Sequence, residues 1–403
     1  MPDQFNAASI RCINDRKMAE SLLTDPLIRR VNEQIARHEE DNPSGLRRRL
    51  LSTSVRLSAR MAPDLHEMAR ECVERLEIDI EPELYVFASP QFNAMCFKPE
   101  EKHLYVMFSS SLIEGFDENE LKFVVGHELG HHAYRHHDIP IGLVLQGNAR
   151  PDPKLALSLF TWSRYAEISA DRAGAHCARD IKAVSRALFK LASGLTGTTI
   201  DFHLDDFLAQ VDEMQVIDQK PGEGAPKEDW FSTHPFSPLR VKALELFDQS
   251  EFARPGGVSA EDLEQAVQRV MGLMDPNYMQ GRTKADEAMR RLLFAGAVLI
   301  GLADGQASEA EVEVFEKFFG RGSLKEGLDV ATLEKSLPER MRQVRETASP
   351  SQAMQVLRDL CLLARAEGHT TSREREVLMR IADGLGLAEA IVDSTLCAEF
   401  EPD

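Results

Sequence analysis

Apolar residues at helical spacing dominate the first 80 residues of the chain. Between Arg48 and Leu76 they recur mostly at steps of three and four, which is typical of amphipathic helices. Pro63 lacks the N–H that a helix interior needs, so we expect it to divide this stretch into two helices. The pattern therefore predicts a helical beginning.

The pattern then changes to two short runs of β-branched and aromatic residues. The runs are Leu84-Tyr85-Val86-Phe87 and Leu104-Tyr105-Val106-Met107-Phe108, and both are bounded by proline, serine or charged residues. Such runs are typical of strands. They predict a small sheet.

Two long helices are predicted after these strands. The first is expected over residues 118 to about 136, because Asp117 and Glu120 have the spacing of a capping box. Pro140 and the Pro151-Asp152-Pro153 turn then interrupt the chain. The second helix is expected to begin after Pro153, to include Asp171 and to end near residue 177.

Segments rich in proline and glycine separate the predicted elements in the remainder of the chain. Residues 217–231 have the composition of a mobile loop, and Pro255-Gly256-Gly257 begins a linker. From about residue 283 the chain is expected to be helical, with an internal repeat in which residues 303–311 align with residues 366–374. Each copy has an acidic-Gly turn, around Asp304 and Glu367, followed by a Ser/Thr-x-x-Glu cap. We read these turns as helix starts rather than as cation sites, since one carboxylate per turn is too few ligands for calcium.

Net charge and hydropathy exclude two classes of protein. The formal net charge of -19 and the pI of about 5.2 disfavour a nucleic-acid partner. The short run Arg47-Arg48-Arg49 is expected to be a solvated helix face. The apolar stretch Leu292–Leu302 is shorter than the ~20 residues of a membrane span, so it predicts a buried core helix and no integral membrane segment.

The cysteines and the N-terminus bear on the compartment. No two of the six cysteines form a Cys-x-x-Cys pair, so we expect reduced, mostly buried thiols. Met1-Pro2-Asp3-Gln4 does not resemble the start of a secretory signal. Together these features predict a cytoplasmic protein.

His127-Glu128-Leu129-Gly130-His131 is an HExxH motif inside the first long helix. Residues four apart share a helix face, so both imidazoles can bind one ion. Glu128 lies one step around the helix, which suits a general base for the attacking water. The motif predicts one catalytic zinc ion per chain, and such an ion needs a third protein ligand.

Two residues compete for the place of third ligand. His137 has the spacing of a metzincin's third histidine, but the glycine that such a turn needs is replaced by Tyr134, so we expect an exposed histidine near the helix end. Glu167 lies on the second long helix, with Asp171 one turn further on the same face. A ligand carboxylate beside a second carboxylate that orients an imidazole is a sensible pair. We favour Glu167.

Three segments in order resemble the HtpX-like and CAAX-prenyl-endopeptidase family of zinc peptidases. They are the region from Asn93-Ala94 to the HELGH sequence, the segment Ser163–Gly174 with its Glu-x-x-x-Asp spacing, and Ser232-Thr233-His234-Pro235. The resemblance implies His127, His131 and Glu167 as metal ligands and Glu128 as general base. It also implies Asp171 as a residue behind the ligands. His234 would either stabilise the oxyanion or occupy a zinc position in a latent state, and Arg240 would be an ion-pair partner.

The C-terminal repeat resembles TerB-like helical domains of the tellurite-resistance type, through Ala303-Asp304-Gly305 and its partner turn. The predicted fold is therefore mainly helical α+β: a zincin-like gluzincin domain with a small sheet, followed by an all-α domain. We expect the peptidase domain over residues 1–255, a helical linker over 256–282 and the TerB-like domain over 283–403.

The function expected from these features is a zinc metalloendopeptidase acting on unfolded or extended protein segments, with a role in quality control or stress response. A peptide substrate would lie antiparallel to the strand around Tyr105, and the C-terminal domain would bind a protein partner. One alternative is a latent or chaperone-like module, in which His234 and the 217–231 loop keep the zinc site closed. Another is a zinc hydrolase with a substrate other than a peptide.

Overall fold

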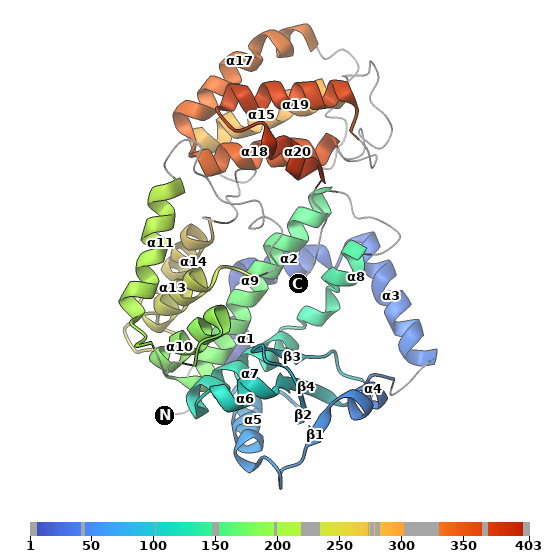
Figure 1. Cartoon of the computed structure of the whole chain (residues 1–403), viewed down its shortest axis with the longest axis vertical. Helices are drawn as coiled ribbons and strands as arrows, with labels where there is room; N and C mark the ends of the chain where they lie inside the picture. Colours follow the sequence, from blue (N-terminus) through green and yellow to red (C-terminus); the bar gives the residue numbers. More distant parts are fainter. Residues whose placement is uncertain are drawn as a thin grey trace. The chain divides into compact units, whose positions relative to one another are not determined.

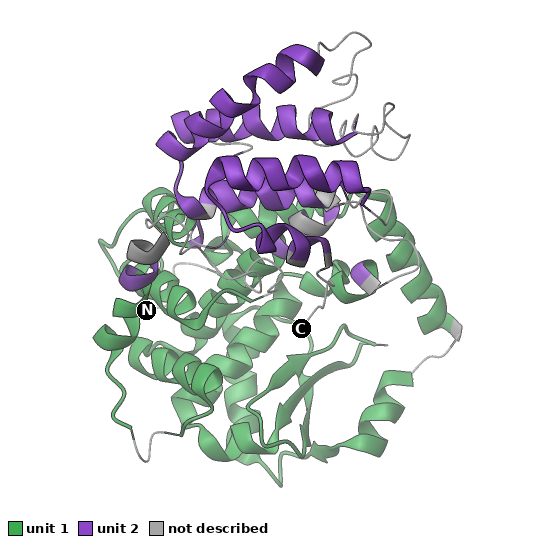
Figure 2. Ribbon diagram, turned by 45° about the horizontal axis from the view of Figure 1, so that its top comes forward, with its two compact units in different colours: residues 1–144, 161–211, 233–270 green, residues 145–160, 212–232, 271–403 purple. Residues whose placement is uncertain are grey.

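The chain forms two compact units, which we call unit 1 and unit 2 (Figure 2). The computed structural model describes residues 6–41, 45–100, 102–146, 153–196, 200–218, 234–272, 274, 278, 283–301, 330–364 and 370–397. Unit 1 contains residues 1–144, 161–211 and 233–270, and unit 2 contains residues 145–160, 212–232 and 271–403.

The described elements up to residue 271 combine helices with one small sheet (Figure 1). They are α1 (Ala7–Ile10), α2 (Ile13–Leu22), α3 (Pro26–Asp41), α4 (Gly45–Thr53), β1 (Val55–Leu57), α5 (Pro63–Arg75), β2 (Pro82–Phe87), β3 (Ala94–Cys96), β4 (Leu104–Ser109), α6 (Ser110–Gly115), α7 (Glu118–Ala133), the 3-10 helix η1 (His136–Asp138), α8 (Ile141–Gln146), α9 (Pro153–Ala178), α10 (Ile181–Ser193), α11 (Leu204–Asp218), α13 (Ser237–Asp248) and α14 (Ala260–Met271). The mainly helical α+β class predicted from the sequence is confirmed.

The sheet has four described strands in the order β1-β2-β4-β3. Strands β2 and β4 run parallel, and β1 and β3 pair antiparallel at the two edges. Alternate residues of the inner strands face opposite sides: Leu84 and Val106 join the main core of unit 1, whereas Tyr85 and Tyr105 pack with Leu50 of α4. The two predicted strands are confirmed, and both are interior.

This strand order corrects the predicted substrate strand. Tyr105 pairs with Glu83 of β2 on one side, and its carbonyl accepts a hydrogen bond from Phe97 N–H on the other (N···O 3.0 Å). Both backbone edges of β4 are occupied, so a peptide has no place to pair there. The edge strand on this side of the sheet is β3.

The short edge strands also correct the predicted elements. The apolar spacing over 48–76 fits a helix, but Val55–Leu57 forms β1 by pairing with β2. Strand β3 was not predicted at all. Three-residue strands have too little periodicity to be distinguished locally, and partner strands decide them. Pro63 does begin a helix, as the first residue of α5.

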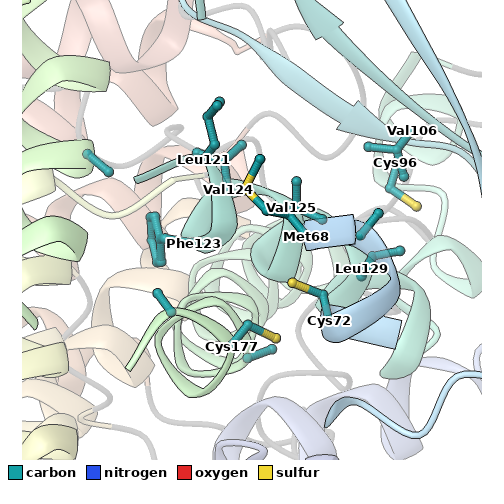
Figure 3. Close-up of a cluster of buried hydrophobic side chains, with 14 of the residues drawn as sticks. Met68, Cys72, Cys96, Val106, Leu121, Phe123, Val124, Val125, Leu129 and Cys177 are labelled. Atoms are coloured by element: carbon teal, nitrogen blue, oxygen red, sulfur yellow. The ribbon is translucent and has the colours of Figure 1, made fainter. Parts of the chain in front are cut away.

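Helix α7 is surrounded by the core of unit 1. Apolar side chains from α5, α9, β3 and β4 gather around it, as Figure 3 shows for Met68, Cys177, Cys96 and Val106. Its residues Leu121, Phe123, Val124, Val125 and Leu129 are buried. Because it is enclosed by apolar neighbours, α7 is held rigidly, which suits an element that carries reactive side chains.

The ends of α7 explain its direction and length. The predicted capping box is present, with Asp117 accepting from the Glu120 N–H (3.0 Å) and Glu120 accepting from the Asp117 N–H (2.8 Å). The helix ends at Ala133, earlier than expected, because Arg135 adopts a left-handed conformation (φ 59°) that turns the chain. This turn places residues 136–138 back beside the helix.

Unit 2 has a core of its own. Its described helices after residue 283 are α15 (Lys284–Gly301), α17 (Val330–Thr347), α18 (Pro350–Ala364), α19 (Ser372–Leu385) and α20 (Ala390–Cys397). The predicted buried helix is confirmed, since Leu292, Leu293 and Val298 lie in this core. The second repeat's cap is also confirmed, as Thr371 and Glu374 form a capping box.

Several predictions fall outside the described residues. These are the repeat copy at 303–311 with Asp304, the turn at Glu367, the Pro151-Asp152 turn and most of the 217–231 loop. The five cysteines for which burial is described are buried free thiols, as expected. No described helix is long and apolar enough to cross a membrane.

Candidate metal centre

Close packing of α7 on α9 brings the reactive side chains together. A Cβ atom on Gly126 would lie 2.7 Å from the Cβ atom of Cys177, and one on Gly130 would lie 2.7 Å from that of Ala173. Both distances are shorter than real Cβ contacts, so only glycine permits this approach. Gly126 immediately precedes His127, and Gly130 immediately precedes His131, so these glycines set how near the two histidines come to α9.

Three predicted ligands meet at this contact. The Nε2 atoms of His127 and His131 lie 3.2 Å apart. Glu167 places Oε2 at 3.5 Å from His127 Nε2 and Oε1 at 3.3 Å from His131 Nε2. Among the described residues, this is the group of histidine, cysteine and acidic side chains whose ligand atoms could hold a metal ion.

The spacing of these atoms fits zinc. Ligand atoms at ~2.0–2.1 Å from a tetrahedral ion are about 3.3–3.4 Å from one another, close to the three observed distances. Oε2 of Glu167 is buried without a hydrogen-bond partner among the described residues, although Arg240 lies 3.4 Å from it, so this oxygen has a lone pair available for a metal ion. Two imidazoles and a carboxylate are also a ligand set that zinc accepts.

The charge of Glu167 suits this role. Burial alone would raise its pKa, but the nearby His234, His131 and His127 bring the pKa of the carboxyl well below its ordinary value. Glu167 is therefore a carboxylate at neutral pH. A buried carboxylate between two imidazoles attracts a cation electrostatically and offers it ligand atoms.

Behind His127 lies the predicted carboxylate, Asp171. Its Oδ1 is 3.0 Å from His127 Nδ1, and Arg240 donates two hydrogen bonds to Asp171 (2.8 and 2.6 Å). Burial would raise the pKa of Asp171, but Arg240 and His127 lower it. Asp171 is therefore ionised, and it accepts a hydrogen bond from His127 Nδ1. This fixes the tautomer that leaves Nε2 free to bind a metal.

Behind His131 lie two residues that sequence reasoning missed. His131 Nδ1 is 2.9 Å from Nδ1 of His136, and His136 Nε2 is 3.1 Å from Oδ2 of Asp15 on α2. Burial lowers the pKa of His136 to about 4, while burial of Asp15 is outweighed by His136 and Arg11, which lower the pKa of its carboxyl. In the sequence, the one signal for His136 is its position five residues after His131, the end of the HExxH motif. No local sequence pattern identifies Asp15 as part of the site.

Glu128 and His234 lie at the site as predicted, outside the ligand group. The Glu128 side chain forms no hydrogen bond or ion pair with a described residue, and 9% of the residue is exposed. His234 is half exposed, and its Nε2 lies 3.6 Å from Glu167 Oε1.

His137 is not part of the ligand group. It is partly buried rather than exposed, because the turn at Arg135 folds residues 136–138 back against the helix. Burial lowers the pKa of His137 to about 3. A cavity of about 480 Å³, lined in part by Ile139, Ile141 and Leu143, opens beside His131 and Glu167.

Two families match the chain. Peptidase family M48 matches residues 59–149 and 152–247, a region that contains His127, Glu128, His131 and Glu167. The family of the tellurite resistance protein TerB matches residues 290–395. Both resemblances proposed from the sequence are confirmed, and Asp15 lies outside either match.

Similar proteins include a metallopeptidase from a plant and protease HtpX homologs from bacteria. The chain is 31% identical to the plastoglobule-localized metallopeptidase 48 of Arabidopsis thaliana, over 50% of this chain and 61% of that protein. It is 25% identical to a protease HtpX homolog of Helicobacter pylori and 27% identical to one of Burkholderia thailandensis, over 50% and 48% of this chain and 72% and 76% of those proteins. No solved structure matches the chain.

Proposed function

We propose that this chain is a zinc-dependent endopeptidase that cleaves unfolded or extended protein segments, because peptidase family M48 and the family of TerB match successive parts of it. One zinc ion per chain is held by His127, His131 and Glu167. The observation that carries the proposal is the near-tetrahedral spacing of three ligand atoms beside an unpaired Glu128.

The residues around the ligands supply the remaining chemistry. Zinc, when bound, supplies a Lewis acid that polarises the scissile carbonyl and makes a water molecule more acidic. Glu128 takes the proton of the attacking water and passes it to the leaving nitrogen. His234 donates a hydrogen bond to the oxyanion of the tetrahedral intermediate from the open side of the site.

The substrate lies along β3, the edge strand beside α7. Phe97 N–H donates to Tyr105 O and Ser109 N–H donates to Asn93 O (3.0 and 2.8 Å), and Met95 pairs with Met107 between them. The backbone groups of Ala94 and Cys96 therefore point away from β4, toward the free edge. Burial and then the nearby charge of Glu128 raise the pKa of Cys96, and this proximity of Glu128 to β3 supports a substrate on that strand.

Pairing through the main chain suits extended substrates of many sequences. An added strand gains affinity from backbone hydrogen bonds, and side-chain pockets only adjust it. Folded proteins offer few free extended segments, so unfolded ones are preferred. We further propose that the protein acts in protein quality control or stress response in the cytoplasm. The TerB domain would bind a protein partner.

A second function rests on the position of His234. Because its Nε2 lies 3.6 Å from a ligand oxygen, His234 can reach the metal as a fourth ligand. Four protein ligands close a zinc site. The chain would then be a latent peptidase or a chaperone-like binding module.

The primary test counts metal and measures cleavage in matched variants. Mass spectrometry should find about one zinc per chain in the wild type and a large loss in Glu167→Ala. Glu128→Gln should retain zinc and lose cleavage of unfolded casein, because only the base is removed. A Glu128→Gln variant that still cleaves would refute the mechanism, and unchanged zinc in Glu167→Ala would refute the ligand set.

A further inference from the structure

The two histidine ligands are supported from behind in different ways. His127 hydrogen-bonds directly to a carboxylate, Asp171. His131 instead faces a second imidazole, His136, which in turn faces the carboxylate of Asp15. The structure thus contains a longer chain of hydrogen bonds, Asp15–His136–His131, whose members come from α2, η1 and α7.

Asp15 can act only as an acceptor in this chain. It is fully buried, and its oxygens receive hydrogen bonds from Arg11 (2.7 and 2.9 Å), Trp162 Nε1 (3.1 Å) and Ser169 Oγ (2.7 Å). Arginine and the indole N–H are donors in every state. A carboxylate surrounded by donors is ionised, so His136 Nε2, at 3.1 Å, must carry a proton toward it.

The position of that proton determines the rest of the chain. If His136 Nε2 is protonated in a neutral ring, His136 Nδ1 is an acceptor. His131 Nδ1, at 2.9 Å, must then be the donor, which leaves His131 Nε2 with the free lone pair that faces His127 and Glu167. In the opposite arrangement His136 donates to His131 Nδ1, and the proton of a neutral His131 would sit on Nε2, where it prevents metal binding.

We propose that Asp15 and His136 are positioning residues that fix the tautomer and ring orientation of His131 and thereby raise the affinity of the site for its metal ion. This inference rests on the proposed metal site. Asp15 lies outside the region that matches peptidase family M48, so the N-terminal helices of this chain complete the site. Asp15 and His136 are 121 positions apart in the sequence, so only the tertiary fold brings them into hydrogen-bonding contact.

The test measures metal affinity by competition with a coloured zinc chelator, independently of cleavage. His136→Leu removes the acceptor for His131, so we expect zinc affinity to fall on the order of 10–100-fold. His136→Asn returns a carbonyl oxygen near the Nδ1 position and should recover much of that loss. Asp15→Asn should also weaken zinc binding, because its amide cannot impose one orientation on His136.

Ser169→Ala is the matched control. Ser169 donates to the same Asp15 oxygen as His136 does, but it does not touch His131. We expect this variant to bind zinc as the wild type does. Equal losses in Ser169→Ala and His136→Leu, or no loss in His136→Leu, would overturn the inference.

A second measurement needs no variant. Nitrogen-15 NMR of the histidine rings in metal-free wild-type protein should show His136 protonated at Nε2 and unprotonated at Nδ1, and His131 protonated at Nδ1. The reverse pattern at the His131–His136 pair overturns the inference even if the variants do not fold. Wild-type protein with these tautomers but no affinity for zinc would instead refute the proposed function.

Discussion

At the residue scale, each group at the site is defined by the partners that surround it. Glu167 stays charged because three histidines outweigh the cost of its burial, whereas Glu128, on the same helix as two of them, has no described partner. The first arrangement suits a ligand, which must remain ionised. The second leaves a carboxylate free to exchange a proton, as a general base must.

His234 provides the prediction at this scale. If it stabilises the oxyanion, His234→Ala should lower kcat about 100-fold or more with unchanged zinc content, because removing such a donor typically costs this much. If it is a fourth ligand, the same variant should lose zinc affinity and gain cleavage. Steady-state kinetics together with the metal count distinguish the two, and the double variant with Glu128→Gln should be inactive in both cases.

At the element scale, the site depends on how closely two helices approach and on which strand lies at the edge. Gly126 and Gly130 let α7 touch α9 at Cys177 and Ala173, and this contact sets the distance between the histidines and Glu167. Interiors packed at this density transmit small displacements rather than absorbing them. A shift of a few tenths of an ångström in α7 would therefore reach the ligand atoms.

Gly130→Ala tests the helix contact. The new Cβ would lie 2.7 Å from that of Ala173, so α7 must move and zinc affinity should fall by about tenfold or more. Ala173→Gly removes the nearest opposing atom, so the double variant Gly130→Ala/Ala173→Gly should regain zinc affinity. The helix propensity lost at position 173, roughly 1 kcal/mol, is offset by a similar gain at position 130. Failure of this rescue in chelator competition would mean that the contact does not set the site.

Ala94→Pro tests the substrate strand. The Ala94 N–H points to the free edge of β3, where proline is tolerated, so the sheet should survive. KM for an unfolded substrate should rise several-fold while the zinc content is unchanged, because one main-chain hydrogen bond is worth about 1 kcal/mol. Met95→Pro is the contrast, since it breaks pairing with β4 and should lower the melting temperature. An unaltered KM in a folded Ala94→Pro protein would place the substrate elsewhere.

At the scale of the whole molecule, the chain carries its proposed metal ligands in one unit and a separate apolar core in the other. His127, His131, Glu167 and Asp15 all belong to unit 1, while α15 and α17–α20 enclose the core of unit 2. Each unit has its own core of buried apolar side chains, as a domain that unfolds independently does. Metal binding should therefore stabilise only part of the molecule.

Calorimetry with and without a chelator tests this division. A ligand present at 1,000 times its Kd stabilises the state that binds it by about 4 kcal/mol. We expect one unfolding transition to move to lower temperature when zinc is removed and a second to stay in place. In Glu167→Ala the chelator should move neither transition. A common shift of all transitions would show that the units unfold together.

The sequence by itself determined the features that are local. The HExxH spacing places two histidines on one helix face, the Asp117–Glu120 box begins that helix, and helical periodicity puts Glu167 and Asp171 one turn apart. These follow from backbone geometry over a few residues. The order of the motifs gave the resemblance to the zinc peptidases, and the internal repeat gave the resemblance to TerB.

Only the tertiary structure decided what depends on distant partners. Strands β1 and β3 exist because neighbouring strands pair with them, and the same pairing makes β4 interior and moves the proposed substrate to β3. Asp15 and His136 reach His131 through the N-terminal helices and a left-handed turn at Arg135. Hydrogen bonds between residues more than a hundred positions apart leave no periodic signal in a single sequence, so they become visible only when the chain is folded.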